Sequence, residues 1–189
     1  MERILRMAAA EVLGEEGLRV LLGAHTESHA GRDEGAAQPT ISYYMESLEE
    51  VFGQQAGRGI ARRVGRACFP HGLREYGNSL GLTQTSFRLL PFPKKLKTLS
   101  AALSMLLQEA AGRHLAMEES AGMLLWHMDG CPLCDERHTN EPACHLAVGL
   151  AEESLYWVSG GKIFQVEESA CVARGDPRCT LQIDMAPIS

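Results

Sequence analysis

Five of the six cysteines in this chain lie in its last third, and this clustering limits what the chain can fold into more than any other feature. Cysteines used only as small core residues would not be expected to gather in one region. Thiols that a fold brings together either form disulfides or bind a metal ion. The clustered residues are Cys131, Cys134, Cys144, Cys171 and Cys179, and Cys68 lies apart from them.

Charge and hydropathy predict a cytoplasmic location, and there a metal ion is favoured over disulfides. The first residues do not read as a signal peptide, because Glu11, Glu15 and Glu16 interrupt the hydrophobic stretch. No apolar run reaches the roughly 18 residues that a membrane span needs. The formal charge of -6 argues against direct nucleic-acid binding, which depends on Lys and Arg neutralising phosphates. We therefore expect a cytoplasmic protein whose thiols stay reduced.

Apolar residues recur at helical spacing in three segments of the first 111 residues. A polar, glycine-rich stretch over 23–39 separates the first two segments and indicates a linker. We therefore divide the chain into an N-terminal helical arm with its linker, residues 1–40, and a main domain, residues 41–189. The three helical segments are 3–22, 42–73 and 96–111.

Four glycines lie in the interior of the second of these segments, in addition to Gly72 near its end, and each costs roughly 1 kcal/mol relative to alanine in an exposed helix. Such a number predicts that another helix or a bound ligand approaches this segment closely, and helix packing is the favoured interpretation. The four residues are Gly53, Gly57, Gly59 and Gly65.

The C-terminal third changes from helical to mixed patterning. One helix is expected to begin after Asn140, which can cap it, and to stop at Gly160 and Gly161. Helices followed by an antiparallel sheet with one crossing helix define an α+β fold, with N-terminal helices packed on a small sheet. The four expected strands are 114–117, 123–128, 162–173 and 178–184.

The last two expected strands would hold two thiols side by side. A hairpin centred on Gly175 places Cys171 directly opposite Cys179, with Cα atoms roughly 4.5–5.5 Å apart. In a reducing compartment such a pair favours zinc, which binds thiolates in tetrahedral geometry. Two more ligands are then required.

The remaining ligands stay open on pattern alone. Strict alternation places Glu167 on the face of Cys171, whereas Glu168 reaches that face only if the strand has a bulge near Ser169 and Ala170. Cys144 starts the preceding helix and is a plausible fourth ligand. Its competitors are Cys131, Cys134 and His145. A site with four protein ligands is closed and structural rather than catalytic.

The segment that carries these residues resembles a known family. Residues 142–183 read PACHLAVGLAEESLYWVSGGKIFQVEESACVARGDPRCTLQI, and this run is similar to the 4-vinyl reductase domain family. The resemblance covers about residues 123–184 and extends more weakly to 44–75. The family includes a bacteriochlorophyll-biosynthesis protein, the sensory domains of phenol- and xylene-responsive activators, and free-standing hydrocarbon-binding proteins.

The resemblance implies a fold, a metal site and an assembly. The fold is the ligand-binding α/β arrangement shared with transport-particle (TRAPP) subunits and haem-type nitric-oxide sensors, and residues 41–189 would form it. A structural zinc ion would be held in the order Cys…Glu-x-x-Cys-x7-Cys, which leaves Cys131 and Cys134 outside the site. The family members are usually homodimers. The implied zinc ligands are Cys144, Glu168, Cys171 and Cys179.

The resemblance also implies a buried pocket beside the zinc for a small, mostly aromatic ligand. In the phenol sensors a Trp and a His hold the ligand's hydroxyl group. Trp126 matches that Trp by position, and His71 and His127 are the candidates for the His. The residues expected to contact the ligand are Trp126, Phe69, His71, Phe87, Tyr156 and Phe164.

Two functions are compatible with these features, and a third is weaker. The sequence has no phosphate-binding loop, nucleophile motif or nucleotide fingerprint, so we expect a zinc-stabilised sensor or carrier of a hydrophobic ligand rather than an enzyme. The alternative is a bacteriochlorophyll or tetrapyrrole biosynthesis protein. Reduction of a vinyl group needs an electron donor, and the sequence shows no site for one, so this protein would be an accessory to a vinyl reductase or a substrate carrier. Redox or iron–sulfur chemistry at Cys131 and Cys134 ranks last.

Overall fold

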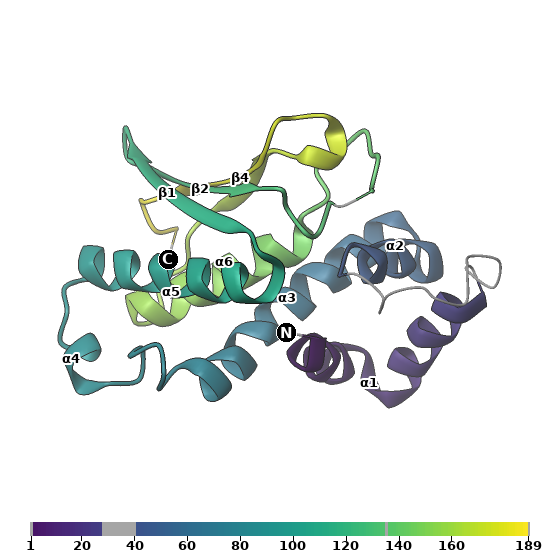
Figure 1. The fold of residues 1–189 in the computed structure, drawn as a ribbon, viewed down its shortest axis with the longest axis horizontal. Helices are drawn as coiled ribbons and strands as arrows, with labels where there is room; N and C mark the ends of the chain where they lie inside the picture. The colour runs from purple at the N-terminus through teal and green to yellow at the C-terminus, as the bar shows by residue number, and fades with distance from the viewer. Residues whose placement is uncertain (1, 28–40, 135, 189) are drawn as a thin grey trace.

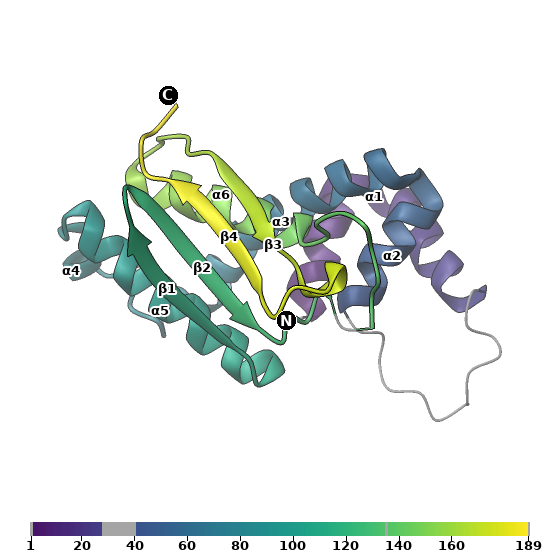
Figure 2. The same cartoon turned by 90° about the horizontal axis from the view of Figure 1, so that it is seen from above.

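The computed structural model describes residues 2–27, 41–134 and 136–188, and within them helices cover one face of a four-stranded antiparallel sheet (Figure 1). The strand order is β1-β2-β4-β3, so β1 and β3 form the two edges. Seen from above, the sheet lies over α5 and α6 (Figure 2). This arrangement confirms the predicted α+β class. The helices are α1 (Glu2–Glu27), α2 (Ile41–Phe52), α3 (Gln54–Tyr76), α4 (Thr85–Arg88), α5 (Phe92–Ala111) and α6 (His145–Ser159), and the strands are β1 (His114–Ser120), β2 (Met123–Asp129), β3 (Val166–Ala170) and β4 (Cys179–Asp184), with a 3-10 turn, η1 (Val172–Arg174), after β3.

Two helices differ from their predicted form because of glycines with positive φ. The expected helix over 42–73 is two helices, since Gly53 adopts a φ of 81° between α2 and α3. Gly14 similarly kinks α1 with a φ of 72°. Side-chain spacing continues across both positions, so periodicity alone could not locate the breaks.

The predicted linker is only partly within the described residues. Residues 23–27, placed in the linker by composition, continue α1 instead. Residues 28–40 lie outside the described part of the chain, so the domain division at residue 40 stays a prediction. Ile4 and Leu21 of α1 are buried in the common core.

Helices α3 and α6 cross at their backbones. A Cβ atom at Gly65 of α3 would overlap the carbonyl oxygen of Leu146, and one at Gly149 of α6 would overlap the carbonyl oxygen of Arg62. The close approach predicted from the glycines of the second helix is therefore confirmed at Gly65. Gly59 faces open space and takes no part in the crossing.

The β3–β4 hairpin contains the bulge that a Glu168 ligand requires. Glu168 pairs with Leu181, but Ala170 pairs with Thr180, so the register shifts by one residue between them. An extra residue on one strand reorients the side chains that follow it. The bulge thus lies at Ser169, where the choice of Glu168 over Glu167 predicted it.

Within the described ranges, no helix combines the length and apolar character needed to span a membrane.

Candidate metal centre

Four buried cysteines converge at the end of the sheet from three separate parts of the chain. Cys144 is the N-cap residue of α6, Cys171 directly follows β3, and Cys179 is the first residue of β4. Cys134 comes from the loop that joins β2 to α6. Each of the four is at most 2% exposed, and all described cysteines are free thiols.

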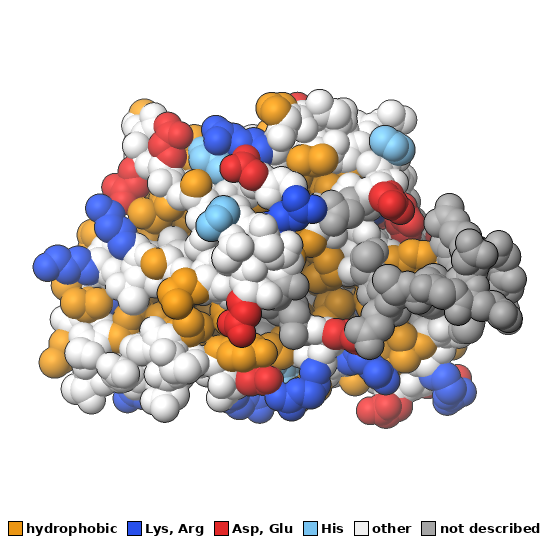
Figure 3. All heavy atoms as spheres, in the orientation of Figure 1, with side chains coloured by type: hydrophobic (Ala, Val, Ile, Leu, Met, Phe, Trp, Pro, Cys, Tyr) orange, Lys and Arg blue, Asp and Glu red, His pale blue; other side chains and the backbone are white. Residues whose placement is uncertain are grey.

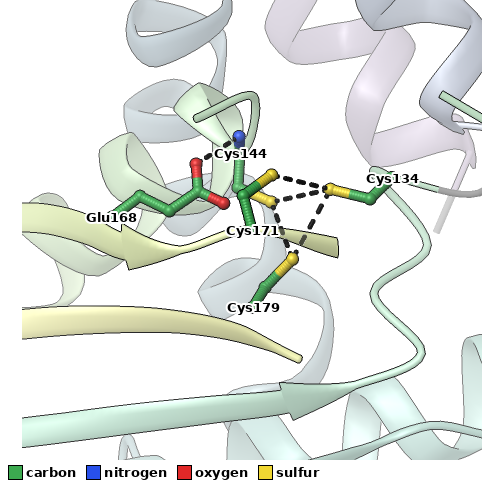
Figure 4. Close-up of side chains that lie close together, drawn as sticks. All are labelled: Cys134, Cys144, Glu168, Cys171 and Cys179. Carbon is green, nitrogen blue, oxygen red and sulfur yellow. Dashed lines mark hydrogen bonds between the residues drawn. The ribbon is translucent and has the colours of Figure 1, made fainter. Parts of the chain in front are cut away.

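The sulfur atoms lie at distances suited to a shared metal ion (Figure 4). The Sγ of Cys134 is 3.2 Å from that of Cys144, 3.6 Å from that of Cys171 and 3.5 Å from that of Cys179. A disulfide would need about 2.05 Å. A zinc ion with bonds of about 2.3 Å separates its sulfur ligands by about 3.8 Å. The thiols are thus slightly closer than a bound zinc would hold them, without being bonded.

Glu168 completes the group and has one oxygen without a partner. Its Oε2 accepts a hydrogen bond of 2.7 Å from the backbone N–H of Cys144. Its Oε1 is buried and has no partner among the described residues. One carboxylate oxygen and the four sulfurs lie within 4.8 Å of one another. Because a buried oxygen without a partner is unfavourable, a cation at this point fits the residues present.

The electrostatics of the cluster also suit a cation. Burial raises the pKa of the Glu168 carboxyl group to about 8. Hydrogen bonds from neighbouring thiols, Cys131 first and Cys144 second, lower the pKa of Cys134, whereas the same crowding raises the pKa of Cys144. Several adjacent thiols cannot all ionise unless a positive charge joins them. By contrast, burial alone raises the pKa of the isolated Cys68 to about 12, as expected for an inert thiol.

Backbone groups support thiolates at two of the four positions. The N–H of Val172 donates a 3.2 Å hydrogen bond to the Sγ of Cys179. Cys144 lies at the N-terminus of α6, where the helix dipole favours negative charge. Both effects favour the ionised form that binds metals.

The structure brings together the four residues that the family resemblance implies and adds one that it excluded. Cys134 was expected outside the metal site, but its Sγ contacts three of the other sulfurs. The Cys131-x-x-Cys134 spacing was the available signal. Cys131 lies 3.4 Å from Cys144 and also interacts with Cys134, but it does not belong to the group of five ligand atoms. His145, the other competitor, is not in that group either.

The residues expected to contact a ligand differ in burial and in the aromatic rings that they contact. Trp126 of β2 is 2% exposed, and its Nε1 has no partner among the described residues. Tyr156 is 47% exposed. The ring centroids of Phe69 and Phe87 lie 5.6 and 5.5 Å from that of Trp157. The Phe164 ring stacks on the Phe92 ring, with their centroids 5.8 Å apart.

The two histidine candidates point away from Trp126 or have other partners. His71 of α3 contacts Glu11 of α1 and Arg74. His127 neighbours Trp126 on β2, so its side chain lies on the opposite face of the strand, where it contacts Thr180.

The loop that carries Cys134 is fixed by a buried arginine that sequence reasoning did not single out. The side chain of Arg137 is 3% exposed and donates a 3.1 Å hydrogen bond to Glu49 of α2. It also donates to the backbone carbonyls of Leu133 and Ala143 within the loop. The loop that carries Cys134 is therefore attached to the N-terminal helices.

This attachment makes Glu49→Gln a test of the loop's contribution to stability. The substitution leaves the buried Arg137 guanidinium with two backbone carbonyls and a more distant carboxylate, Glu46, at 3.9 Å. We expect a loss of about 2 kcal/mol, less than for a fully buried pair because Glu49 is 21% exposed. Urea unfolding measures it, with Glu50→Gln on the exposed face of the same helix as the control, expected within about 0.5 kcal/mol of wild type. Equal effects of the two substitutions would contradict the role given to the ion pair.

Solved structures share this fold at low sequence identity. No protein-family model and no curated protein matches the chain. The phenol-responsive sensory domain of the transcription activator PoxR, solved with phenol, is 18% identical over 76% of this chain and 71% of that one, with a TM-score of 0.56. An H-NOX protein from S. oneidensis is 10% identical over 98% of both chains, with a TM-score of 0.61. An H-NOX protein from K. algicida is 11% identical over 96% of this chain and 94% of that one, with a TM-score of 0.58.

These likenesses establish the class of fold. The chain has the α+β fold of H-NOX proteins and of a phenol-responsive sensory domain. Within that fold it carries a buried group of four cysteines and a glutamate that could hold a metal ion.

Proposed function

We propose that this chain is a binding module, a sensor or carrier, for a small hydrophobic ligand of the aromatic class, and that one zinc ion stabilises its fold. The main observation in favour of ligand binding is the indole N–H of Trp126, which is buried without an acceptor among the described residues. Leaving such a donor unpaired costs about 1–3 kcal/mol. An oxygen atom on a bound ligand would remove that cost.

The surroundings of Trp126 support an apolar ligand. Met117 and Leu181 are its partners on the neighbouring strands, and the hydroxyl of Ser100 on α5 contacts the Met117 sulfur at 3.3 Å. Trp126 therefore lies on the face of the sheet that α5 covers. A small ligand here would be enclosed by apolar side chains around a single polar anchor, as such sites usually are.

A surface groove offers a route to this position. It runs along α5 and β1 with a volume of about 710 Å³, and Met117 forms part of its wall. The space-filling view presents this side of the molecule, where hydrophobic side chains are interspersed with polar and charged ones (Figure 3). Met117 is the cross-strand partner of Trp126, so one residue of the groove wall is a neighbour of Trp126 in the sheet.

The metal would stabilise the same end of the sheet. Cys179 pairs with Met128, which lies two residues from Trp126 on the same face of β2. Cys144, Cys171 and Cys179 would supply three thiolates, and Glu168 or Cys134 the fourth ligand. A tetrahedral site filled by protein groups has no position for water, so its zinc would be structural.

We also propose membership of the 4-vinyl reductase domain family. The Cys…Glu-x-x-Cys-x7-Cys order supports it, as does the fold likeness to a phenol-responsive sensory domain. A tetrapyrrole ligand, as carried in pigment biosynthesis, is the alternative within that family.

Calorimetric titration with phenol, toluene and a porphyrin tests the ligand class. We expect saturable binding of phenol, and Trp126→Phe should weaken it roughly 3- to 10-fold, because it removes one hydrogen bond worth about 0.5–1.5 kcal/mol. Toluene has no acceptor, so its binding should not weaken. Trp157→Phe is the matched control and should leave phenol binding close to wild type. Binding of porphyrin alone would favour the tetrapyrrole alternative, and an equal loss in both variants would contradict the role of Trp126.

A further inference from the structure

We propose that Cys134 is the fourth metal ligand, so that this chain holds its ion with four thiolates from Cys134, Cys144, Cys171 and Cys179, while Glu168 lies beside the ion as a reserve ligand. This inference rests on the metal binding proposed above. It differs from the three-thiolate, one-carboxylate set that the family resemblance implies.

The position of its sulfur is the first argument for Cys134. Its Sγ lies 3.2–3.6 Å from the sulfurs of Cys144, Cys171 and Cys179, so it contacts each of the other three thiols of the proposed ligand set. The Sγ atoms of Cys144 and Cys179 are a further 3.5 Å apart. Four of the six separations among these sulfurs are therefore slightly shorter than the roughly 3.8 Å between thiolates around zinc, and the other two are at most 4.8 Å.

The position of Glu168 is the second argument. Cys134 and Glu168 approach the other three cysteines from opposite sides (Figure 4). A four-coordinate ion bound by those three thiolates therefore takes one of the two as its last ligand. Glu168 uses Oε2 to accept the N–H of Cys144 and has only Oε1 left as a reserve donor, whereas the Cys134 sulfur is buried and contacts only thiols. Zinc also readily accepts an all-thiolate set.

The loop holds Cys134 in place before any metal binds. The N–H of Cys134 donates to the carbonyl of Cys131 at 3.0 Å, and its own carbonyl accepts from the N–H of Arg137 at 3.2 Å. Arg137 is in turn paired with Glu49 on α2. A ligand positioned in this way loses little conformational entropy on binding the ion.

A metal bound through Cys134 would connect three parts of the fold. It would join the loop over 130–143 to the start of α6 and to the β3–β4 hairpin. Through Arg137 and Glu49 it would also connect to α2. Exchange of Cys134 for Glu168 would release the loop while the ion stayed bound.

X-ray absorption at the zinc edge of the full-length chain distinguishes the two ligand sets, since zinc–sulfur bonds are about 2.3 Å and zinc–oxygen bonds about 2.0–2.2 Å. We expect four sulfurs in wild type and in Glu168→Gln. In Cys134→Ser we expect three sulfurs and one oxygen as Glu168 moves onto the ion, with zinc affinity lower by about tenfold or more in chelator competition. Cys131→Ser is the matched control from the same turn, and it should keep four sulfurs and wild-type affinity.

The opposite pattern would overturn the inference and leave the proposed metal site intact. Three sulfurs and one oxygen in wild type, unchanged in Cys134→Ser but lost in Glu168→Gln, would assign the fourth position to Glu168. Failure of the wild-type chain to take up zinc would instead reject the metal site itself.

Discussion

Replacing Cys171 by Ser in a chain that also carries Glu168→Gln, so that the reserve ligand is removed as well, is expected to abolish metal binding and to remove about 5 kcal/mol or more of folding free energy. Cys171 is fully buried where β3 meets η1. Its backbone N–H donates a 2.8 Å hydrogen bond to the Asp176 carboxylate, which fixes the residue at its ligand position. The binding free energy of a structural zinc ion is part of the folding free energy, and it reaches about 10–16 kcal/mol in small zinc domains. For a chain of this size the loss corresponds to a fall in Tm of roughly 10–20 °C.

Thermal unfolding with and without a chelator measures this effect. The chelator should lower the Tm of wild type toward that of the Glu168→Gln, Cys171→Ser double variant and leave the double variant unchanged. Cys68→Ala is the matched control, because Cys68 is a buried thiol of α3 outside the cluster; it should keep its metal and its response to the chelator. A double variant that unfolds at the wild-type temperature under both conditions would contradict the stabilising role of the metal.

The second large effect is expected at the crossing of α3 and α6. A methyl group at Gly65 would occupy the position of the Leu146 carbonyl oxygen, and one at Gly149 that of the Arg62 carbonyl oxygen. Backbone atoms cannot rotate aside as a side chain can, so the helices must separate. We expect Gly65→Ala and Gly149→Ala each to cost about 3 kcal/mol or more.

Gly59→Ala, on the same helix, is expected to stabilise the fold rather than destabilise it. A Cβ at Gly59 meets no atom within 4 Å, so alanine should stabilise α3 by up to about 1 kcal/mol. Urea unfolding of the three variants compares them directly. If Gly65→Ala were as stable as Gly59→Ala, the two helices would not approach as closely as described.

Much of the architecture was predictable because local patterns specify it. The apolar spacing of α5 and the glycines after α6 mark those helices directly, and the glycines of α3 indicated a close crossing. The breaks at Gly14 and Gly53 were not predictable in the same way, since a positive φ leaves the side-chain spacing on either side unchanged.

The candidate site was predictable where its residues are close in sequence. The Cys171–Cys179 hairpin follows from strand pairing, and Glu168 could be chosen over Glu167 only with the bulge that the structure contains. The place of Cys134 depends on how a long loop folds back over the sheet, which no periodic pattern records. The packing of Trp126 has the same origin, because a spacing rule gives its strand but not the unpaired state of its N–H.

The metal content of the full-length chain, purified under reducing conditions and measured by inductively coupled plasma mass spectrometry, tests the central proposal most directly. One zinc ion per chain, retained through dialysis and released only by a strong chelator with loss of cooperative unfolding, is the expected result. A fully folded chain that contains no metal and whose unfolding does not change when zinc is added would contradict it.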